Sequence, residues 1–119
     1  MAPTASNPMP ASTASTTLTG ELRRVDPVHY GSGQVTITGR ELRFDQVDIA
    51  GAPNMYVYLS DGTDGQPGHY IDLGPLKATN GSFNYAIPAE ADLGPVRSVV
   101  VWCRAFSVTV TFATLTATR

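Results

Sequence analysis

The sequence of 119 residues contains one cysteine, and 15% of its residues are charged. A single cysteine excludes an internal disulfide, a CxxC redox pair and a zinc site built from several cysteines. Eight basic residues stand against ten acidic ones, with no run of either sign. Binding of nucleic acid and electrostatic adhesion to an anionic membrane both need clustered positive charge, so both are excluded. No stretch approaches the roughly 20 apolar residues that a membrane-spanning helix requires.

The first nineteen residues differ in composition from the rest of the chain. Residues 1–19 carry no charge and no glycine, and they consist almost entirely of Ala, Ser, Thr and Pro. Such a segment has little apolar surface to offset the entropy lost on ordering, so we expect a disordered tether followed by a folded domain at 20–119. The segment also lacks the basic start and apolar core of a signal peptide. We therefore expect a secreted or membrane-anchored lipoprotein whose export signal is absent from this sequence.

From residue 20 onward the hydrophobic pattern has the period of two that β-strands show. Alternating or β-branched runs occupy eight segments, 34–38, 41–47, 54–60, 70–73, 76–79, 82–87, 98–103 and 106–112. The pair Asn80-Gly81 is typical of a type I′ turn and predicts a hairpin between 76–79 and 82–87. No segment carries a helical stripe longer than one turn. The sequence therefore predicts an all-β domain, an antiparallel β-sandwich or flattened barrel of about eight short strands.

Several residue groups suggest chemistry that their context does not support. The Gly-Ser-Gly segment 31–33 precedes a strand and not a helix, so it indicates a turn or bulge and not a phosphate cradle. The loop 61–65 is acidic but lacks the alternating ligands of a calcium loop. The two histidines, His29 and His69, stand in no nucleophile or zinc motif, so we expect no metal site and no stand-alone enzyme activity.

Cys103 can be interpreted in two ways. It shares strand parity with Val99 and Val101, which places the thiol toward the core as a small packing residue. Trp102 and Arg104 then share the opposite face. A reactive thiol needs a positive and partly open environment, which only Arg104 supplies locally. The ligand types of a blue-copper centre are present, but the His and Met that follow the cysteine in such proteins are absent. We expect a mostly buried, unpaired thiol near the strand end, close to the sheet edge.

Five motifs occur in order along the chain. Gly20 is followed by His29-Tyr30-Gly31-Ser32-Gly33, and the others are GAPNMYVYLS at 51–60, YIDLGPLK at 70–77, NYAIP at 84–88 and VVVWCRAFSV at 99–108. Together they resemble the DM-thirteen domain family, the electron-transfer domain that accompanies DOMON domains in Skeletor-like cell-surface proteins. The resemblance runs from Gly20 to about Leu115. One departure is Asn54, where the family often has aspartate.

The resemblance implies a β-sandwich-like domain outside the cytoplasm with a redox or electron-transfer role centred on Cys103. That cysteine would act as a bare thiol or as the ligand of a prosthetic group such as haem, with His29 as a second cofactor-binding candidate. Its partner would be a redox or cell-envelope protein. The alternative is a non-catalytic module that binds a protein or glycan at the cell surface through exposed aromatic rings, with candidates Trp102, Tyr56, Tyr58 and Tyr70.

Overall fold

The computed structural model describes residues 17–118, which form ten strands and no helix. The strands are β1 (Thr17–Glu21), β2 (Arg23–Arg24), β3 (Gly31–Thr38), β4 (Glu41–Ile49), β5 (Met55–Ser60), β6 (Tyr70–Pro75), β7 (Asn80–Ala86), β8 (Ser98–Cys103), β9 (Val108–Thr114) and β10 (Thr116–Thr118). Since residues 17–118 contain no helix, none of them forms a helix that could cross a bilayer.

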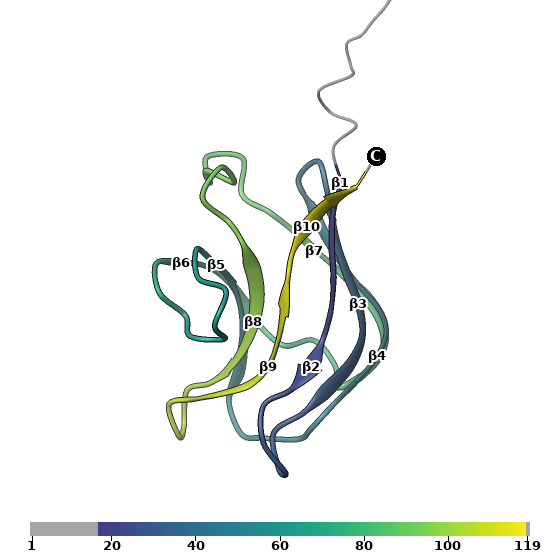
Figure 1. Ribbon diagram of the computed structural model, residues 1–119, viewed down its shortest axis with the longest axis vertical. Coiled ribbons are helices and arrows are strands. Elements are labelled where there is room, and N and C mark those ends of the chain that lie inside the picture. Colours follow the sequence, from purple (N-terminus) through teal and green to yellow (C-terminus); the bar gives the residue numbers. More distant parts are fainter. Residues whose placement is uncertain (1–16, 119) are drawn as a thin grey trace, which may run out of the picture.

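Two antiparallel sheets of five strands face each other (Figure 1). Sheet A has the strand order β10-β1-β3-β4-β7, and sheet B has the order β2-β9-β8-β5-β6. The predicted all-β fold is therefore confirmed as a sandwich, and the sheets do not close into a barrel. The loops β2–β3, β4–β5 and β8–β9 lie at one end of the sandwich, away from the described ends of β1 and β10 (Figure 1).

The core lies between the inner faces of the two sheets and follows directly from the alternating sequence. In β4, Leu42 and Phe44 are fully buried while their neighbours along the strand are exposed or half-buried. Phe44 stacks on Phe83 with ring centroids 4.9 Å apart, and the Tyr85 ring meets it edge-on at 5.8 Å. Sheet B supplies the facing apolar residues of β5 and β8 to the same core.

Strand β1 begins inside the segment that we expected to be a tether. Thr17, Leu18 and Thr19 pair with both β3 and β10, so the expectation is wrong for these three residues. The physical reason is that β-branched threonines flank Leu18, which packs against the core, and two neighbouring strands satisfy the backbone. Residues 1–16, which make up the rest of the expected tether, lie outside the described residues.

The predicted hairpin at Asn80-Gly81 is wrong. Both residues lie inside β7 and pair with β4, and 76–79 is not a strand. Gly81 has the positive φ, 102°, that the pair suggested, but a shift in the β4–β7 register lies beside it and no turn forms there. The backbone N–H of Lys77 donates instead to the Tyr85 hydroxyl at 2.8 Å, which removes it from strand pairing. By contrast, the bulge predicted at 31–33 is confirmed, with a register shift at Gly33, whose φ is 103°.

The β5–β6 loop, residues 61–69, folds back over the outer face of sheet B. Three buried hydroxyl groups on that face hold its backbone. Ser98 Oγ donates to the Gly62 carbonyl at 2.7 Å, and Thr109 Oγ1 donates to the Gly65 carbonyl at 2.6 Å. Ser60 Oγ accepts from the Gly62 N–H at 3.0 Å. This loop explains why the outer face of sheet B is partly covered, and it borders the site described next.

Candidate functional site

Cys103 is the last residue of β8, the central strand of sheet B. Its side chain faces the core together with Val99 and Val101, and all three are completely buried. The cysteine is free, as expected, because the chain has no second one. The expected place at the strand end is also found. The expected place at the sheet edge is wrong, because β5 and β9 pair with β8 on either side.

The Cys103 thiol is closed in by the β4–β5 loop. Its Sγ donates a hydrogen bond to the Pro53 carbonyl at 3.1 Å, and the Arg104 N–H donates to the Asn54 carbonyl at 3.0 Å. Asn54 adopts a left-handed φ of 60°, which turns its carbonyl toward β8. The thiol proton therefore has an acceptor, and no disulfide or other large reactant reaches the sulfur in this arrangement.

A haem group does not fit at Cys103. A haem-ligating sulfur needs open space for the macrocycle on its outer side, and this sulfur belongs to a fully buried residue packed between the sheets. It also lines none of the three pockets described for residues 17–118. Within the same range, no three His, Cys, Asp or Glu side chains are grouped so that they could hold a metal ion.

The outer face of sheet B, opposite the Cys103 thiol, carries a cluster of aromatic rings around Arg104. We define the arginine–tyrosine cluster as Tyr56, Tyr58, Tyr70, Asp72 and Arg104. The Arg104 guanidinium lies 3.5 Å from the centroid of the Tyr56 ring, and its Nε donates to the Tyr58 hydroxyl at 3.0 Å. It also forms an ion pair with Asp72. The Tyr58 and Tyr70 rings stack with centroids 4.0 Å apart.

These contacts limit what the aromatic residues can offer to a ligand. Tyr58 is 2% exposed, and burial raises the pKa of its phenol although the Arg104 hydrogen bond lowers it. Tyr56 is half-buried beneath the Arg104 guanidinium. Tyr70 is 49% exposed, and Trp102 is half-buried next to Tyr56 on the neighbouring strand. Of the four predicted aromatic residues, Tyr70 is therefore the most exposed, and Tyr58 is closed to a ligand.

Trp102 forms part of the wall of a hollow of about 240 Å³ at the loop end of the sandwich. Strand alternation places its indole on the face opposite Cys103. Val25 and Asp26 of the β2–β3 loop line one side of the hollow, and Ser107 of the β8–β9 loop lines another. The remaining lining residues are Gln66, Val108 and Thr109. Of the two neighbouring residues of the Trp-Cys pair, Trp102 therefore faces a hollow on the surface, and Cys103 faces the buried core.

His29 lies in the β2–β3 loop and is bound to Asp26, not to Cys103. Its Nδ1 is 2.9 Å from the nearer Asp26 oxygen, and the backbone N–H groups of Val28 and His29 donate to the same carboxylate. The hydrogen bond from the His29 ring, with further help from the Val28 N–H, lowers the pKa of the Asp26 carboxyl. His29 thus shares the loop end with Cys103, but no hydrogen bond joins the two side chains.

Replacing His29 is expected to raise the pKa of Asp26. In His29→Ala the ring donor is gone, so the Asp26 pKa should move up toward the unperturbed value of about 3.9. In the wild type the lowered pKa of Asp26 stabilises the fold at pH values above the pKa that this carboxyl has in the unfolded chain. The stabilisation is lost as the pH falls through the pKa of Asp26 in the folded protein. Carbon-detected NMR titration of the carboxyl groups measures the shift. Asp61, whose pKa is lowered by its bond to His69, is the internal control and should not change.

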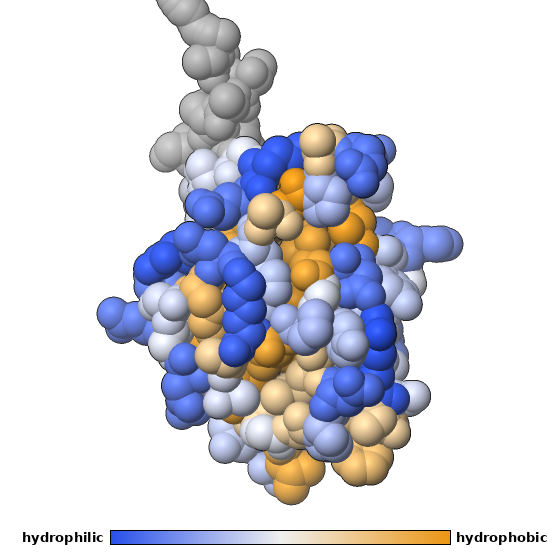
Figure 2. Space-filling model, turned by 180° about the vertical axis from the view of Figure 1, so that it is seen from behind, coloured by the Kyte–Doolittle hydropathy of each residue, from blue (hydrophilic) through white to orange (hydrophobic). Residues whose placement is uncertain are grey.

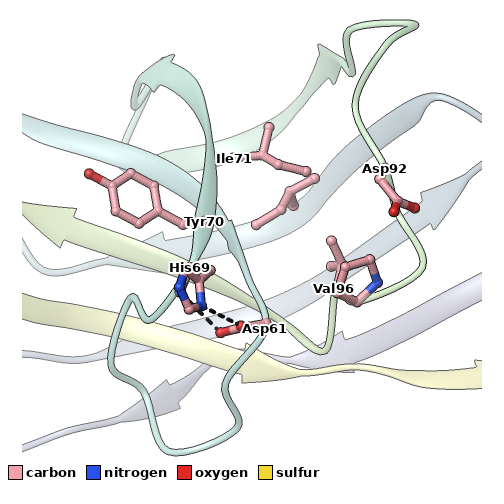
Figure 3. Close-up of a pocket in the computed structure, with 8 residues that line it drawn as sticks. Asp61, His69, Tyr70, Ile71, Asp92 and Val96 are labelled. Atoms are coloured by element: carbon pink, nitrogen blue, oxygen red, sulfur yellow. Dashed lines mark hydrogen bonds and ion pairs between the residues drawn. The ribbon is translucent and has the colours of Figure 1, made fainter.

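A second pocket lies at the β6 edge of sheet B, with a volume of about 350 Å³ (Figure 3). Leu59, Ile71 and Val96 form its apolar floor. At its rim the Asp61 carboxylate and His69 Nδ1 are 3.1 Å apart. Tyr70 of the arginine–tyrosine cluster also lines this pocket, and Figure 3 shows its ring pointing away from Ile71 and Val96.

Sequence reasoning missed two features of the site. The ion pair of Arg104 with Asp72 joins positions 32 residues apart, and the thiol bond to Pro53 joins positions 50 residues apart. Arg104 follows the Trp-Cys pair directly, which is the one local signal that could have pointed to it.

Most of the described domain matches one known protein family. A family model described as electron transfer DM13 matches residues 23–115. No curated protein and no solved structure matches the chain. The matched range includes Cys103, His29 and every member of the arginine–tyrosine cluster.

Proposed function

Because this chain belongs to the electron transfer DM13 family, we propose that it carries single electrons for a partner protein, with Cys103 as the redox-active group and Trp102 as its contact with the surface. The observation that carries this proposal is the position of the two residues at the end of β8. Trp102 borders a hollow, and Cys103 lies next to it in the chain, closed off from solvent.

In the proposed step the partner oxidises the Trp102–Cys103 pair by one electron. An oxidised metal centre of high potential on the partner takes one electron from the Trp102 indole. The Cys103 thiol returns one electron to the indole, and its proton passes by way of the Pro53 carbonyl to water, to which Pro53 is exposed. A one-electron reductant and a proton returned from water then restore the thiol. Burial of the sulfur supports this role, because it protects a transient thiyl radical from reaction with other thiols and with water.

We also infer that the domain works outside the cytoplasm. The Ala, Ser, Thr and Pro composition of residues 1–16 is typical of a linker in an exported or lipid-anchored protein. Fractionation of the native host tests this inference, with recovery in the envelope or medium as the expected result and recovery in the cytoplasm as the contrary one.

The alternative, a module that binds protein or glycan through its aromatic rings, has less support. Tyr58 is buried and Arg104 covers Tyr56, so two of its four candidate residues have their rings engaged within the domain.

Removal of the Cys103 sulfur is expected to lengthen the lifetime of a radical formed on Trp102. A photoexcited ruthenium tris-bipyridine complex with a cobalt(III) acceptor oxidises Trp102, the one tryptophan of the chain, and transient absorption follows the indole radical. In the wild type the thiol refills the indole, so the radical should decay several-fold faster than in Cys103→Ala.

Val101→Ala is the matched control, because it removes buried apolar volume from the same strand without removing a redox group. Its radical lifetime should equal that of the wild type. Equal lifetimes in the wild type and in Cys103→Ala would remove Cys103 from the electron path. Trp102→Phe should prevent thiyl formation, detected by electron paramagnetic resonance of frozen samples.

A further inference from the structure

We propose that the loop end of the sandwich docks a protein electron carrier whose contact face has an apolar centre and an acidic rim, and that this partner reaches Trp102 through the hollow there. The proposal rests on the proposed function and names the docking surface and the chemistry of the partner.

Apolar side chains are concentrated at this end. Among the described residues, five large hydrophobic side chains are exposed, and four of them belong to the β2–β3 and β8–β9 loops. Val28 is 67% exposed and Phe106 is 66% exposed, while Val25 and Tyr30 are 43% and 37% exposed. Figure 2 shows the corresponding apolar colour at the end of the molecule away from the grey segment. Exposed apolar patches of this kind mark interaction sites.

The hollow beside Trp102 lies between these two loops. Val25 and Asp26 line it from the β2–β3 loop, and Ser107 lines it from the β8–β9 loop. A partner that covers the loop tips can therefore place one side chain against the indole. Because Cys103 follows Trp102 in the chain, docking here brings the partner closest to the proposed redox group.

The charge around the patch is positive. The Arg23 guanidinium lies 5.0 Å from the Phe112 ring centroid, and that of Arg24 lies 4.9 Å from the centroid of Tyr30. Neither arginine forms an ion pair within residues 17–118. The Asp26 carboxylate, which hydrogen-bonds to the His29 ring, offsets one of the two positive charges, so the segment 23–30 keeps a net positive charge. The chain as a whole has a net charge of −2, so the net charge of this segment has the opposite sign to that of the whole chain. Complementarity then selects a partner with an acidic rim.

The shape and polarity of the hollow favour a protein over a lipid surface. Its lining includes polar groups of Asp26, Gln66, Ser107 and Thr109. Hydrocarbon chains would bury the Asp26 carboxylate away from water. They would also leave the side chains of Gln66 and Ser107, which have no hydrogen-bond partner within residues 17–118, unpaired, and both effects are costly. A polar or aromatic side chain of a protein can satisfy them while the rim of the interface excludes water.

The local charge is tested first, without a partner. As the one tryptophan in the chain, Trp102 reports on the hollow through its fluorescence. We expect iodide to quench the indole several-fold more efficiently than caesium, and Arg23→Gln to reduce that preference. Equal quenching by the two ions would overturn the assignment of positive charge to this end.

Docking is tested with two soluble haem proteins, the acidic cytochrome b5 and the basic cytochrome c. We expect cytochrome b5 to shift the NMR signals of Val28, Trp102 and Phe106, with an affinity that falls as salt is added. The double variant Val28→Ser, Phe106→Ser should bind roughly tenfold more weakly. Both side chains are too exposed for their loss to unfold the domain. Cytochrome c should not bind this end.

The control variant is Tyr70→Ser, which removes the one exposed large hydrophobic residue outside the patch and should leave binding unchanged. Absence of binding, signal shifts elsewhere on the domain, or equal affinity of the double variant would overturn the proposal. Sedimentation with phosphatidylcholine–phosphatidylglycerol vesicles, abolished in the double variant, would identify a lipid surface instead. Because the radical experiment uses a soluble oxidant, failure of docking and failure of the Cys103 electron path are separate results.

Discussion

Gly65→Ala is expected to lower the free energy of unfolding by roughly 2–5 kcal/mol, because a left-handed backbone and a steric overlap both oppose the added methyl group. Gly65 has a φ of 89°, and a Cβ built on it would lie 2.8 Å from the nearest carbon of the Phe112 ring. The β5–β6 loop must then lift from the outer face of sheet B, which also weakens the bond from Thr109 to the Gly65 carbonyl.

Denaturant unfolding followed by Trp102 fluorescence measures this loss, and acrylamide quenching reports whether the hollow opens. Gly62→Ala is the matched control in the same loop, because Gly62 lacks a positive φ and its nearest contact would be 3.4 Å. We expect it to change stability by less than half as much. If the two variants unfold at the same denaturant concentration, the loop does not pack on Phe112 as described.

Phe44→Ala is expected to be the most destabilising single truncation of the core, at about 3–5 kcal/mol. The ring is completely buried, stacks on Phe83 and meets Tyr85, so its loss leaves a cavity between the sheets. Phe44→Leu keeps most of the volume and should cost less than about 1.5 kcal/mol. A small effect of Phe44→Ala in calorimetric or denaturant unfolding would mean that the ring is not part of the core.

Local pattern was sufficient to predict the burial of individual strands. In β8, the alternation of Val99, Val101 and Cys103 predicted an inward thiol, and all three side chains are completely buried. This works because successive residues of a strand point to opposite faces. The residue types of a single strand therefore indicate which of its two faces is buried. The sandwich followed from several such strands in the same chain.

Pairing between strands could not be predicted in the same way. Asn80-Gly81 has the local preference of a turn, yet β4 pairs with both residues and keeps them in β7. A turn preference contributes a small free energy, and the backbone hydrogen bonds and core contacts of a strand edge outweigh it. The start of the domain at Thr17 was missed for the same reason, since β3 and β10 supply the partners of β1.

The sequence by itself determined that this protein is an all-β domain of its family with one inward cysteine and no disulfide. Only the tertiary structure decided that Cys103 lies on the central strand, with its thiol hydrogen-bonded to the Pro53 carbonyl. It also decided that Arg104 contacts Tyr56, Tyr58 and Asp72, and that the β2–β3 and β8–β9 loops place their apolar residues at one end. The first two of these features join positions 32 to 50 residues apart, and the two loops lie still farther apart in the sequence. The alternation of apolar and polar residues can be read from the sequence of each strand alone. The order of the strands and the loops that lie side by side depend on how the whole chain buries its apolar surface and pairs its backbone hydrogen-bonding groups.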